Sequence, residues 1–306
     1  MVTSPDNRGM KDHQLRALIQ VAERGSIRSA AKAMHLTQSA LTKALRELEE
    51  DVGAELLLRS YQGVEFTTAG QALLSRARLA AATLARAREE IRDIQGGAGI
   101  RVAVAATPTV AMSVLPRVWE SFQRTQPHAE LTLSDGLLSS VVPGLVEGLL
   151  DFAIALADPA GLPEEVLFEP ITSVVAWPAV RVGHPLGQAR DWADLSQAQW
   201  ILNLSAGSQG AFLLRWLRDA GIEPSRSIVR CTSPGLMLEM MRRTDLVGFC
   251  PQPLMDDPLY SAGLQRITLD PLPPPMSLGM LRLRGVPLST AAKSLAQLFV
   301  RHLGAA

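Results

Sequence analysis

The sequence predicts an α+β chain of several domains: an N-terminal winged helix-turn-helix, one long helix, and a C-terminal part with two α/β lobes. Its 306 residues are too many for one ordinary core and suit two or three domains. Three short helical patterns and two short strand patterns come first. A long proline-free segment follows, and beyond residue 100 buried strand patterns alternate with helical ones.

The three N-terminal helices are delimited by their capping residues. Gly25 stops the first helix, Ser26 is a candidate N-cap for the second, and Gly53 ends the third. Residues 1–9 are expected to form a loose tail, and a turn at Gln62-Gly63 between two strands predicts a wing within a domain spanning residues 10–67. The expected inward-facing residues are Leu15, Leu18, Ile19 and Ala22, then Ala30, Ala31 and Met34, then Leu41, Ala44, Leu45 and Leu48.

The outward face of the third helix is polar and predicts contacts with double-stranded DNA. In a helix-turn-helix the first residues of this helix enter the major groove, where Gln and Lys read bases and Ser, Thr and Arg hold phosphates. Residues 11–46 also hold seven basic residues against two acidic ones, although the net charge of the chain is zero. The alternative is a small helical bundle with a polar surface. The outward residues are Gln38, Ser39, Thr42, Lys43 and Arg46.

Residues 68–95 predict a linker helix that pairs with a second copy. Apolar residues recur at alternating steps of four and three over three heptads, which is typical of a dimerising seam. An amphipathic helix lying on its own domain is the alternative. Gly96 to Gly99 then predict a hinge before residues 96–306. The seam residues are Leu73, Ala77, Ala80, Leu84, Ala87, Ile91 and Ile94.

The C-terminal part predicts a parallel sheet with helices on both faces in each lobe. We expect strands at 100–106, 129–134, 151–156, 173–177 with its neighbours, 200–204, 227–231, 245–250 and 277–283, and helices at 110–124, 139–149, 209–220, 235–242 and 288–303. The chain is expected to cross between lobes twice, so that one lobe holds about 99–168 and 268–306 and the other about 169–267.

Hydroxyl and amide side chains follow several of these strands. A ligand of an open parallel sheet binds beyond the carboxyl ends of the strands, and helix N-termini there favour an anion. We therefore expect a small anionic effector in the cleft between the lobes. Ordinary helix capping is the alternative for each position. The candidate residues are Thr107, Thr109, Ser205, Ser208, Gln209 and Thr232.

The sequence gives little support to an enzyme, a metal-binding protein or a membrane protein. Gly96 to Gly99 precede a strand instead of following one, so they are no dinucleotide fingerprint. The five histidines are scattered, without a pair at metal-ligand spacing, and no nucleophile turn is present. These missing motifs predict a protein that is not an enzyme and has no cofactor. We expect it to be cytoplasmic and to have no membrane partner, because neither a signal peptide nor a long apolar segment is seen.

Residues 11–70 resemble the LysR-type transcriptional regulators. The resemblance rests on an Ala-rich second helix, the TQSAL entry to the third helix beginning at Thr37, the segment LEEDVGAELL, a wing opening with Arg59, and the entry Thr67 to Gly70 into the linker helix. Gly183-His184-Pro185-Leu186 resembles a further element of the family. Ser39 departs from the proline that many members carry.

This resemblance implies an operator-binding regulator that forms homodimers or homotetramers. It implies two lobes similar to periplasmic binding proteins, with the effector between them, and RNA polymerase as a further partner. By the same resemblance, Arg59 lies near the minor groove or backbone, and Ser26 and Arg28 lie near phosphates. Two alternatives stay open: a metabolite-binding protein whose N-terminal domain serves assembly alone, and a thiol redox sensor that uses Cys231 and Cys250.

Overall fold

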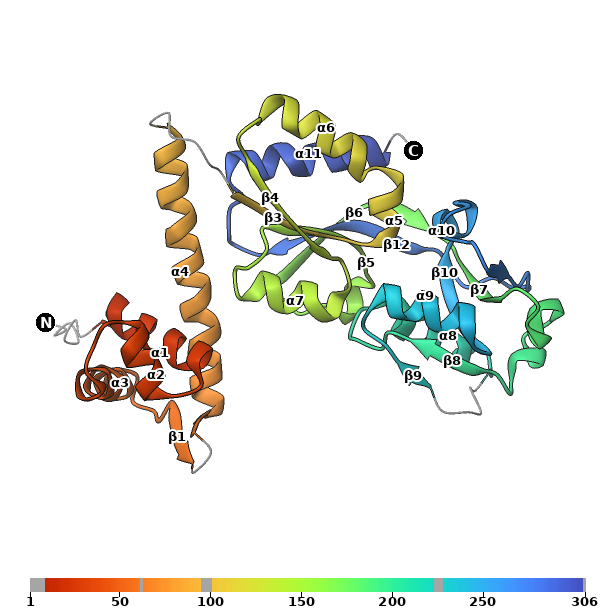
Figure 1. Cartoon of the computed structure of the whole chain (residues 1–306). Coiled ribbons are helices and arrows are strands. Elements are labelled where there is room, and N and C mark those ends of the chain that lie inside the picture. The colour runs from red at the N-terminus through yellow and green to blue at the C-terminus, as the bar shows by residue number, and fades with distance from the viewer. Residues whose placement is uncertain (1–8, 61–62, 95–100, 223–227, 305–306) are drawn as a thin grey trace, which may run out of the picture. The chain divides into compact units, whose positions relative to one another are not determined.

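A computed structural model describes residues 9–60, 63–94, 101–222 and 228–304 (Figure 1). The chain divides into two compact units, an N-terminal unit made mainly of residues 1–88 and a C-terminal unit made mainly of residues 89–306. Residues 1–8 of the predicted tail, Gln62 of the predicted wing turn and the predicted hinge at Gly96 to Gly99 lie outside the described residues.

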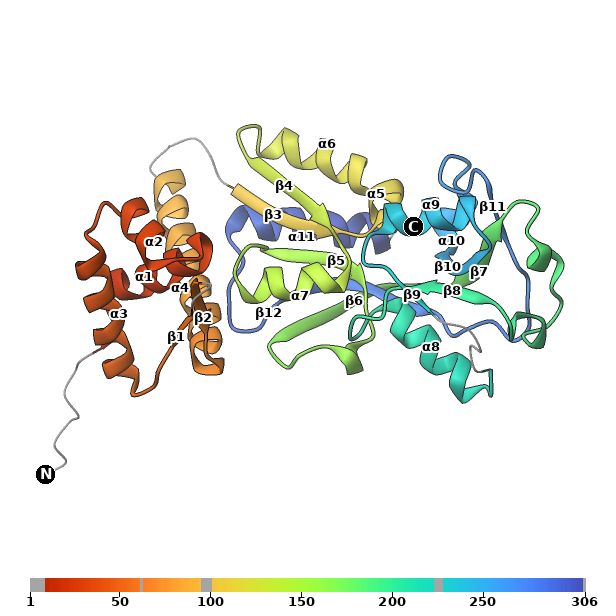
Figure 2. The same cartoon turned by 60° about the horizontal axis from the view of Figure 1, so that its bottom comes forward.

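The N-terminal unit is a three-helix core with a two-stranded wing. It contains α1 (Asp12–Arg24), α2 (Ile27–Ala33), α3 (Gln38–Val52), and the antiparallel pair β1 (Leu57–Ser60) and β2 (Gly63–Phe66). The predicted helix limits are confirmed: Gly25 and Gly53 adopt φ angles of 70° and 72° as C-caps, a conformation in which glycine has no Cβ penalty. Ala17, Leu18, Ala30, Leu41, Leu45 and Leu48 form the buried core around which Figure 2 shows the three helices gathered.

Helix α4 (Thr68–Ile94) leaves this core partway along its length. Leu73 and Leu74 pack against the core, and Ala77 is buried. Further along, Leu84 and Ile91 are 52% and 55% exposed, which is unusual for large apolar side chains at regular helical spacing. The first part of the predicted seam therefore belongs to the core of the N-terminal unit, and the rest lies on the surface of the single chain.

The first lobe is a five-stranded sheet between two helical layers. Its strand order is β4-β3-β5-β12-β6, with α6 and α11 on one face and α7 on the other (Figure 1). Apolar clusters fill both faces, which explains why strand β5 is buried along its whole length. The elements are β3 (Arg101–Ala106), α5 (Pro108–Ser113), α6 (Leu115–Thr125), β4 (Glu130–Asp135), α7 (Leu138–Val146), β5 (Phe152–Leu156), η1 (Pro159–Gly161), β6 (Val166–Val174), β12 (Met276–Leu283) and α11 (Thr290–Gly304).

The second lobe is a five-stranded sheet in the order β11-β7-β10-β8-β9. Aromatic rings mark its core, where Trp200 stacks on Phe249 with ring centroids 5.1 Å apart. The elements are β7 (Ala176–Arg181), η2 (Pro185–Gln188), η3 (Ala193–Leu195), β8 (Gln199–Leu202), α8 (Gln209–Asp219), β9 (Val229–Arg230), α9 (Pro234–Arg243), β10 (Leu246–Pro251), α10 (Gln252–Asp256) and β11 (Leu264–Arg266).

Three expectations for the C-terminal unit are corrected. Both sheets are mixed, because β12 runs antiparallel to β5 and β6, and β7 runs antiparallel to β10 and β11. The helix expected at 110–124 is two helices that meet at Val114, since Pro116 cannot continue a helix across this point. Strand β6 stays in the first sheet up to Val174, so the first crossing lies at Val175 and not near residue 168.

Candidate nucleic-acid interface and ligand cavity

The start of α3 presents polar side chains to solvent. Thr37 is the N-cap, and its hydroxyl accepts a hydrogen bond from the Ala40 amide at 3.2 Å. Gln38, Ser39 and Lys43 are exposed, with the Lys43 side chain 79% accessible. Buried Leu41, Leu45 and Leu48 fix the opposite face inward, so the amphipathic pattern determines which side chains a partner meets.

One predicted contact residue of α3 is less available than expected. Thr42 is half-buried, and its hydroxyl donates to the Gln38 carbonyl at 2.8 Å. This bond to the preceding turn is a common use of a threonine within a helix. Thr42 therefore borders the polar face formed by Gln38, Ser39, Lys43 and Arg46.

Two arginines add free positive charge. Arg28 on α2 and Arg46 on α3 are exposed, and neither forms an ion pair with any residue that the structure describes. Lys43 lies 3.8 Å from Glu47, a contact between exposed groups that holds the ammonium only weakly. Ser26 caps α2 by accepting from the Ser29 amide at 3.2 Å, and Arg59 lies on β1 opposite Val64.

The C-terminal unit holds a cavity of about 110 Å³ lined by both lobes. Thr107 and Thr109 come from the start of α5, and Gly136 and Leu138 come from the segment after β4. The second lobe contributes the end of β8, the start of α8, one side of α9, the end of β10 and part of α10. The residues from the second lobe are Leu202, Asn203, Ser208, Gln209, Gly210, Leu213, Pro234, Met237, Leu238, Met241, Phe249, Cys250, Pro251 and Leu254.

Three polar groups of the cavity lining are buried without a hydrogen-bond partner among the described residues. They are the Thr107 Oγ1, the Asn203 Nδ2 and the Gln209 Nε2. Thr107 and Asn203 are only 5% and 6% exposed. Buried polar groups are nearly always paired, so three exceptions in one cavity are typical of a binding site for a polar ligand.

The orientation of Asn203 is fixed by its neighbour. Its Oδ1 accepts hydrogen bonds from the Ser205 amide at 3.0 Å and from the Ser205 hydroxyl at 2.7 Å. Because the amide N–H can only donate, the oxygen of the Asn203 side chain must face Ser205, which leaves the NH2 group on the other side. Ser205 itself was expected in the site but is not part of the lining; it acts on the cavity by holding Asn203.

The remaining predicted residues divide into lining and non-lining positions. Thr109 and Ser208 line the cavity, but the Ser208 hydroxyl donates to the Asn203 carbonyl at 2.7 Å and accepts from the Ala211 amide, as an ordinary helix cap does. Thr232 is exposed and lies outside the lining, because β9 ends at Arg230 on the edge of its sheet. Thr107 occupies the N-cap position of α5, but its side chain forms no capping hydrogen bond.

Sequence reasoning missed Asn203 and the apolar wall of the cavity. Asn203 directly follows β8, so the strand-end argument that selected Ser205 could have found it. The apolar residues Met237, Leu238 and Met241 come from α9, where their spacing resembles that of any core-facing helix. Burial in this wall raises the pKa of the Cys250 thiol to about 12, so the thiol stays protonated near neutral pH.

Contacts between the lobes hold the loop that leads into α8. Asp158, after β5, forms an ion pair with Arg215 of α8, and the Asp158 amide donates to the Gly207 carbonyl at 2.8 Å. Gly161 packs against the same loop, where a Cβ at position 161 would lie 2.4 Å from the Gly207 amide nitrogen. The position of Ser208 and Gln209 in the cavity therefore depends on residues of the first lobe.

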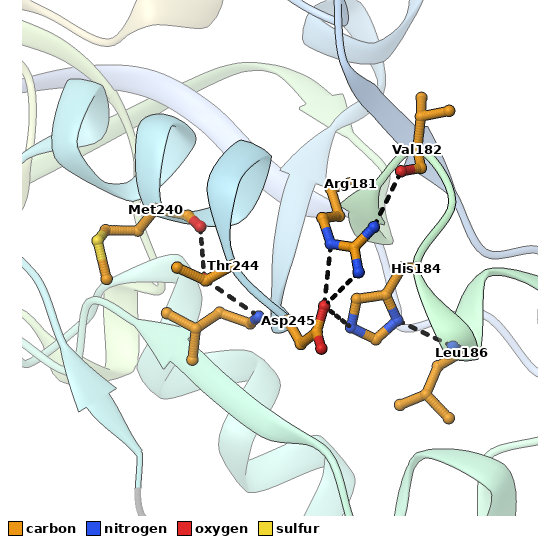
Figure 3. Close-up of polar contacts among 8 residues, drawn as sticks. Arg181, Val182, His184, Leu186, Met240, Thr244 and Asp245 are labelled. Atoms are coloured by element: carbon orange, nitrogen blue, oxygen red, sulfur yellow. Dashed lines mark hydrogen bonds and ion pairs between the residues drawn. The ribbon is translucent and has the colours of Figure 1, made fainter.

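His184 belongs to the structural cluster shown in Figure 3 and is not among the residues that line the cavity. Its Nδ1 accepts from the Leu186 amide at 2.9 Å and caps η2, and its Nε2 lies 3.9 Å from Asp245. Arg181 donates to the same carboxylate oxygen from Nε at 2.9 Å and approaches it with Nη2 at 2.7 Å. The cluster joins the turn after β7 to the start of β10, and His184 serves in it as the cap of η2.

No group of three His, Cys, Asp or Glu side chains in the described segments of the chain could hold a metal ion. Within the same segments, none of the helices has the length and apolar character needed to cross a membrane.

Known protein families match both the N-terminal and the C-terminal part of the chain. A model described as LysR substrate binding domain matches residues 95–304, and one described as bacterial regulatory helix-turn-helix protein, lysR family, matches residues 13–71. The HTH-type transcriptional regulator YdcI of Escherichia coli (strain K12) is 30% identical over 259 residues, which cover 82% of each chain. The HTH-type transcriptional regulator TdcA of the same strain is 26% identical over 241 residues, covering 79% of this chain and 77% of TdcA.

Solved structures show the same fold. The crystal structure of CbnR, a LysR family transcriptional regulator, matches with a TM-score of 0.67 at 22% identity and covers 96% of this chain and 99% of CbnR. CbnR complexed with its target DNA matches with a TM-score of 0.64 at 23% identity, covering 96% and 99%. These relatives and fold neighbours are transcriptional regulators, not enzymes. The chain therefore belongs to the LysR family of DNA-binding transcriptional regulators, with a helix-turn-helix domain followed by a two-lobed effector-binding domain.

Proposed function

We propose that the protein binds a dyad-symmetric operator sequence-specifically, with one α3 helix in the major groove of each half-site. The observation that carries this proposal is the exposed polar start of α3, where Gln38, Ser39, Lys43 and Arg46 stand opposite a fully buried apolar face. Gln38 and Lys43 have donors and acceptors suited to base edges, and Arg46, Arg28 and Arg59 supply charge for phosphates. The structure of CbnR with its target DNA, on a similar fold, supports this reading.

Helix α4 is the proposed subunit contact. The seam residues that the N-terminal unit leaves uncovered are Ala80, Leu84, Ala87 and Ile91, and they recur at heptad spacing. Small alanines between larger apolar side chains allow two helices to approach closely. A homodimer would place two copies of α3 on two half-sites, and a homotetramer would pair two such dimers.

The cavity between the lobes is the proposed effector site. Its unpartnered groups at Thr107, Asn203 and Gln209, next to the N-terminus of α8, suit a small anion. Effector binding across both lobes would change their relative position and so alter the bound operator. RNA polymerase as a further partner remains an expectation from the resemblance to the family, and a cytoplasmic location remains an expectation from the sequence.

The test is a selection of bound DNA from a random pool by the purified full-length protein at fixed salt. An interrupted palindrome is the expected product, because a symmetric dimer reads the same half-site twice. Repeating the selection with Gln38→Ala should relax the preference at one position of each half-site. If no sequence is enriched at any salt concentration, the proposal is wrong and the N-terminal unit serves assembly alone.

A further inference from the structure

The cavity's unpartnered groups define the head of its ligand. The side-chain NH2 groups of Asn203 and Gln209 can only donate hydrogen bonds, and the Thr107 hydroxyl can donate one as well. A ligand that pairs with these donors must supply acceptor atoms. The start of α8 adds the positive end of its helix dipole at Gln209 and Gly210, both of which line the cavity. Together these groups suit a carboxylate better than a hydroxyl or an amide.

The lining also limits the charge of the ligand. No Asp, Glu, Lys or Arg occurs among the described lining residues. Neutral donors can hold one negative charge, whereas a second carboxylate placed among the described lining residues would find no cationic side chain to pair with. An ammonium group would lack a carboxylate for the same reason. Dicarboxylates and zwitterionic amino acids are therefore poorly matched to this cavity.

The rest of the wall defines the body of the ligand. Apolar side chains from both lobes surround the donors, among them Leu138, Met237, Met241, Phe249 and Leu254. The volume of about 110 Å³ is somewhat smaller than that of an apolar cavity of about 150 Å³ known to take up benzene. A body no larger than a single ring, carrying few polar atoms, suits these walls; a sugar would bury hydroxyls against them.

We infer that the effector is a monocarboxylate with an apolar body of about the size of one six-membered ring, its carboxylate held by Thr107, Asn203 and Gln209. This inference rests on the proposed effector function and narrows it to one class of ligand. Uncharged donors that are themselves buried bind a carboxylate through short, charge-assisted hydrogen bonds, so no lysine or arginine is needed.

The test compares four ligands that share a cyclohexane ring, with calorimetry on the full-length protein. Cyclohexanecarboxylate should bind. Cyclohexylmethanol, which lacks the charge, and cyclohexane-1,4-dicarboxylate and cyclohexylglycine, which add one, should each bind about ten-fold more weakly or worse. Equal or tighter binding of any of these three would overturn the inferred class while leaving a ligand-binding cavity in place.

Two variants locate the bound carboxylate. Asn203→Asp keeps the oxygen that holds Ser205 but replaces the NH2 donor with a negatively charged acceptor, so it should weaken cyclohexanecarboxylate binding about 100-fold or more. Thr107→Val, which removes one hydroxyl at nearly constant volume, should weaken it about ten-fold. Thr232→Ala is the matched control, because Thr232 lies outside the lining, and it should bind like the wild type.

The failure of this inference can be told apart from failure of the proposed function. If Asn203→Asp binds the carboxylate as well as the wild type does, or if no ligand of the set binds at millimolar concentration, the inferred class is wrong. The DNA selection described above needs no effector, so an enriched palindrome would still support operator binding in either case. Unaltered melting temperatures of Asn203→Asp and Thr107→Val would show that both variants fold.

Discussion

The polar face of α3 and the cavity between the lobes are built in opposite ways. On α3 the charged groups Lys43 and Arg46 are exposed, and the hydroxyls of Thr37 and Thr42 are already used within the helix. In the cavity the groups left over are uncharged and buried, and charged side chains are absent from the described lining. One region offers charge at the surface, and the other offers unpaired donors inside.

This difference follows from what each region has to bind. DNA is a polyanion, and neutralising its phosphates releases counterions, so its binding depends steeply on salt. A small anion bound between the lobes is held by oriented donors, because unpaired charged side chains would be costly to bury there. The two binding reactions of one chain should therefore respond differently to salt and to mutation.

The largest expected effect comes from breaking the proposed subunit contact, which should weaken DNA binding without changing ligand binding. Leu84→Arg places a charge on the exposed seam of α4 and should dissociate the proposed dimer. Affinity for the selected duplex should fall about 100-fold, since each half-site is then bound alone. Sedimentation and DNA titration would measure both changes, and ligand affinity of the cavity should stay the same. Leu259→Arg, at another exposed leucine, is the control; a dimeric Leu84→Arg protein would contradict the proposed seam.

The next effect concerns the loop that carries Gln209. Gly161→Ala would bring a Cβ within 2.4 Å of the Gly207 backbone, so the loop must shift. We expect a loss of about 1–3 kcal/mol in the free energy of unfolding, together with weaker ligand binding. Gly235→Ala is the matched control, because nothing lies within 4 Å of its added Cβ. Equal melting temperatures of the two variants would mean that the close packing of Gly161 is unimportant.

A smaller effect is expected on the surface of α3. Arg46→Ala removes an exposed charge that has no ion-pair partner among the described residues, so the fold should be unaffected. Affinity for the selected duplex should fall about ten-fold, and the salt slope should become shallower by about one unit. Lys43→Ala should behave similarly if Lys43 contacts a phosphate. Arg301→Ala, an exposed arginine of α11, should change neither quantity, and an unchanged slope for Arg46→Ala would place the DNA on another face.

The smallest expected effect is at the cysteines. Because burial holds the pKa of Cys250 near 12, its reactive thiolate is scarce at pH 7, and peroxide should leave DNA binding unchanged. Half-buried Cys231 should react with iodoacetamide faster than Cys250 does in the native protein. Cys250→Ala should reproduce the wild-type response to peroxide. A peroxide effect that disappears in this variant would revive the thiol sensor as an alternative.

The raised pKa of Cys250 also makes the stability of the fold depend on pH. The folded state keeps the Cys250 proton up to a higher pH than the unfolded state, whose thiol has a pKa near the ordinary value of 9.0. The contribution of this residue is therefore complete below pH 9 and is lost as the pH rises toward 12. Melting curves of the wild type and Cys250→Ala should accordingly converge or cross only in that alkaline range.

The two regions also differ in how well the sequence predicts them. The α3 face lies on one helix, so the spacing of Leu41, Leu45 and Leu48 is enough to assign its outward residues. The cavity draws on segments from both lobes, and the sequence cannot show which hydroxyl is left unpaired. Thr107 and Ser208 both occupy N-cap positions, yet only Ser208 forms the cap bond. The apolar residues of α9 have the spacing of an ordinary core-facing helix, so the sequence alone does not assign them to a cavity wall.

The most direct test of this contrast is a salt titration of both binding reactions with one preparation of the protein. Affinity for the selected duplex and affinity for cyclohexanecarboxylate would be measured across the same range of potassium chloride. Plotted against the logarithm of the salt concentration, the logarithm of DNA affinity should fall with a slope of several units, about 0.9 for each phosphate neutralised. The corresponding slope for the ligand should be smaller than about one. Similar slopes for the two reactions would contradict the division between a charged surface and a neutral cavity.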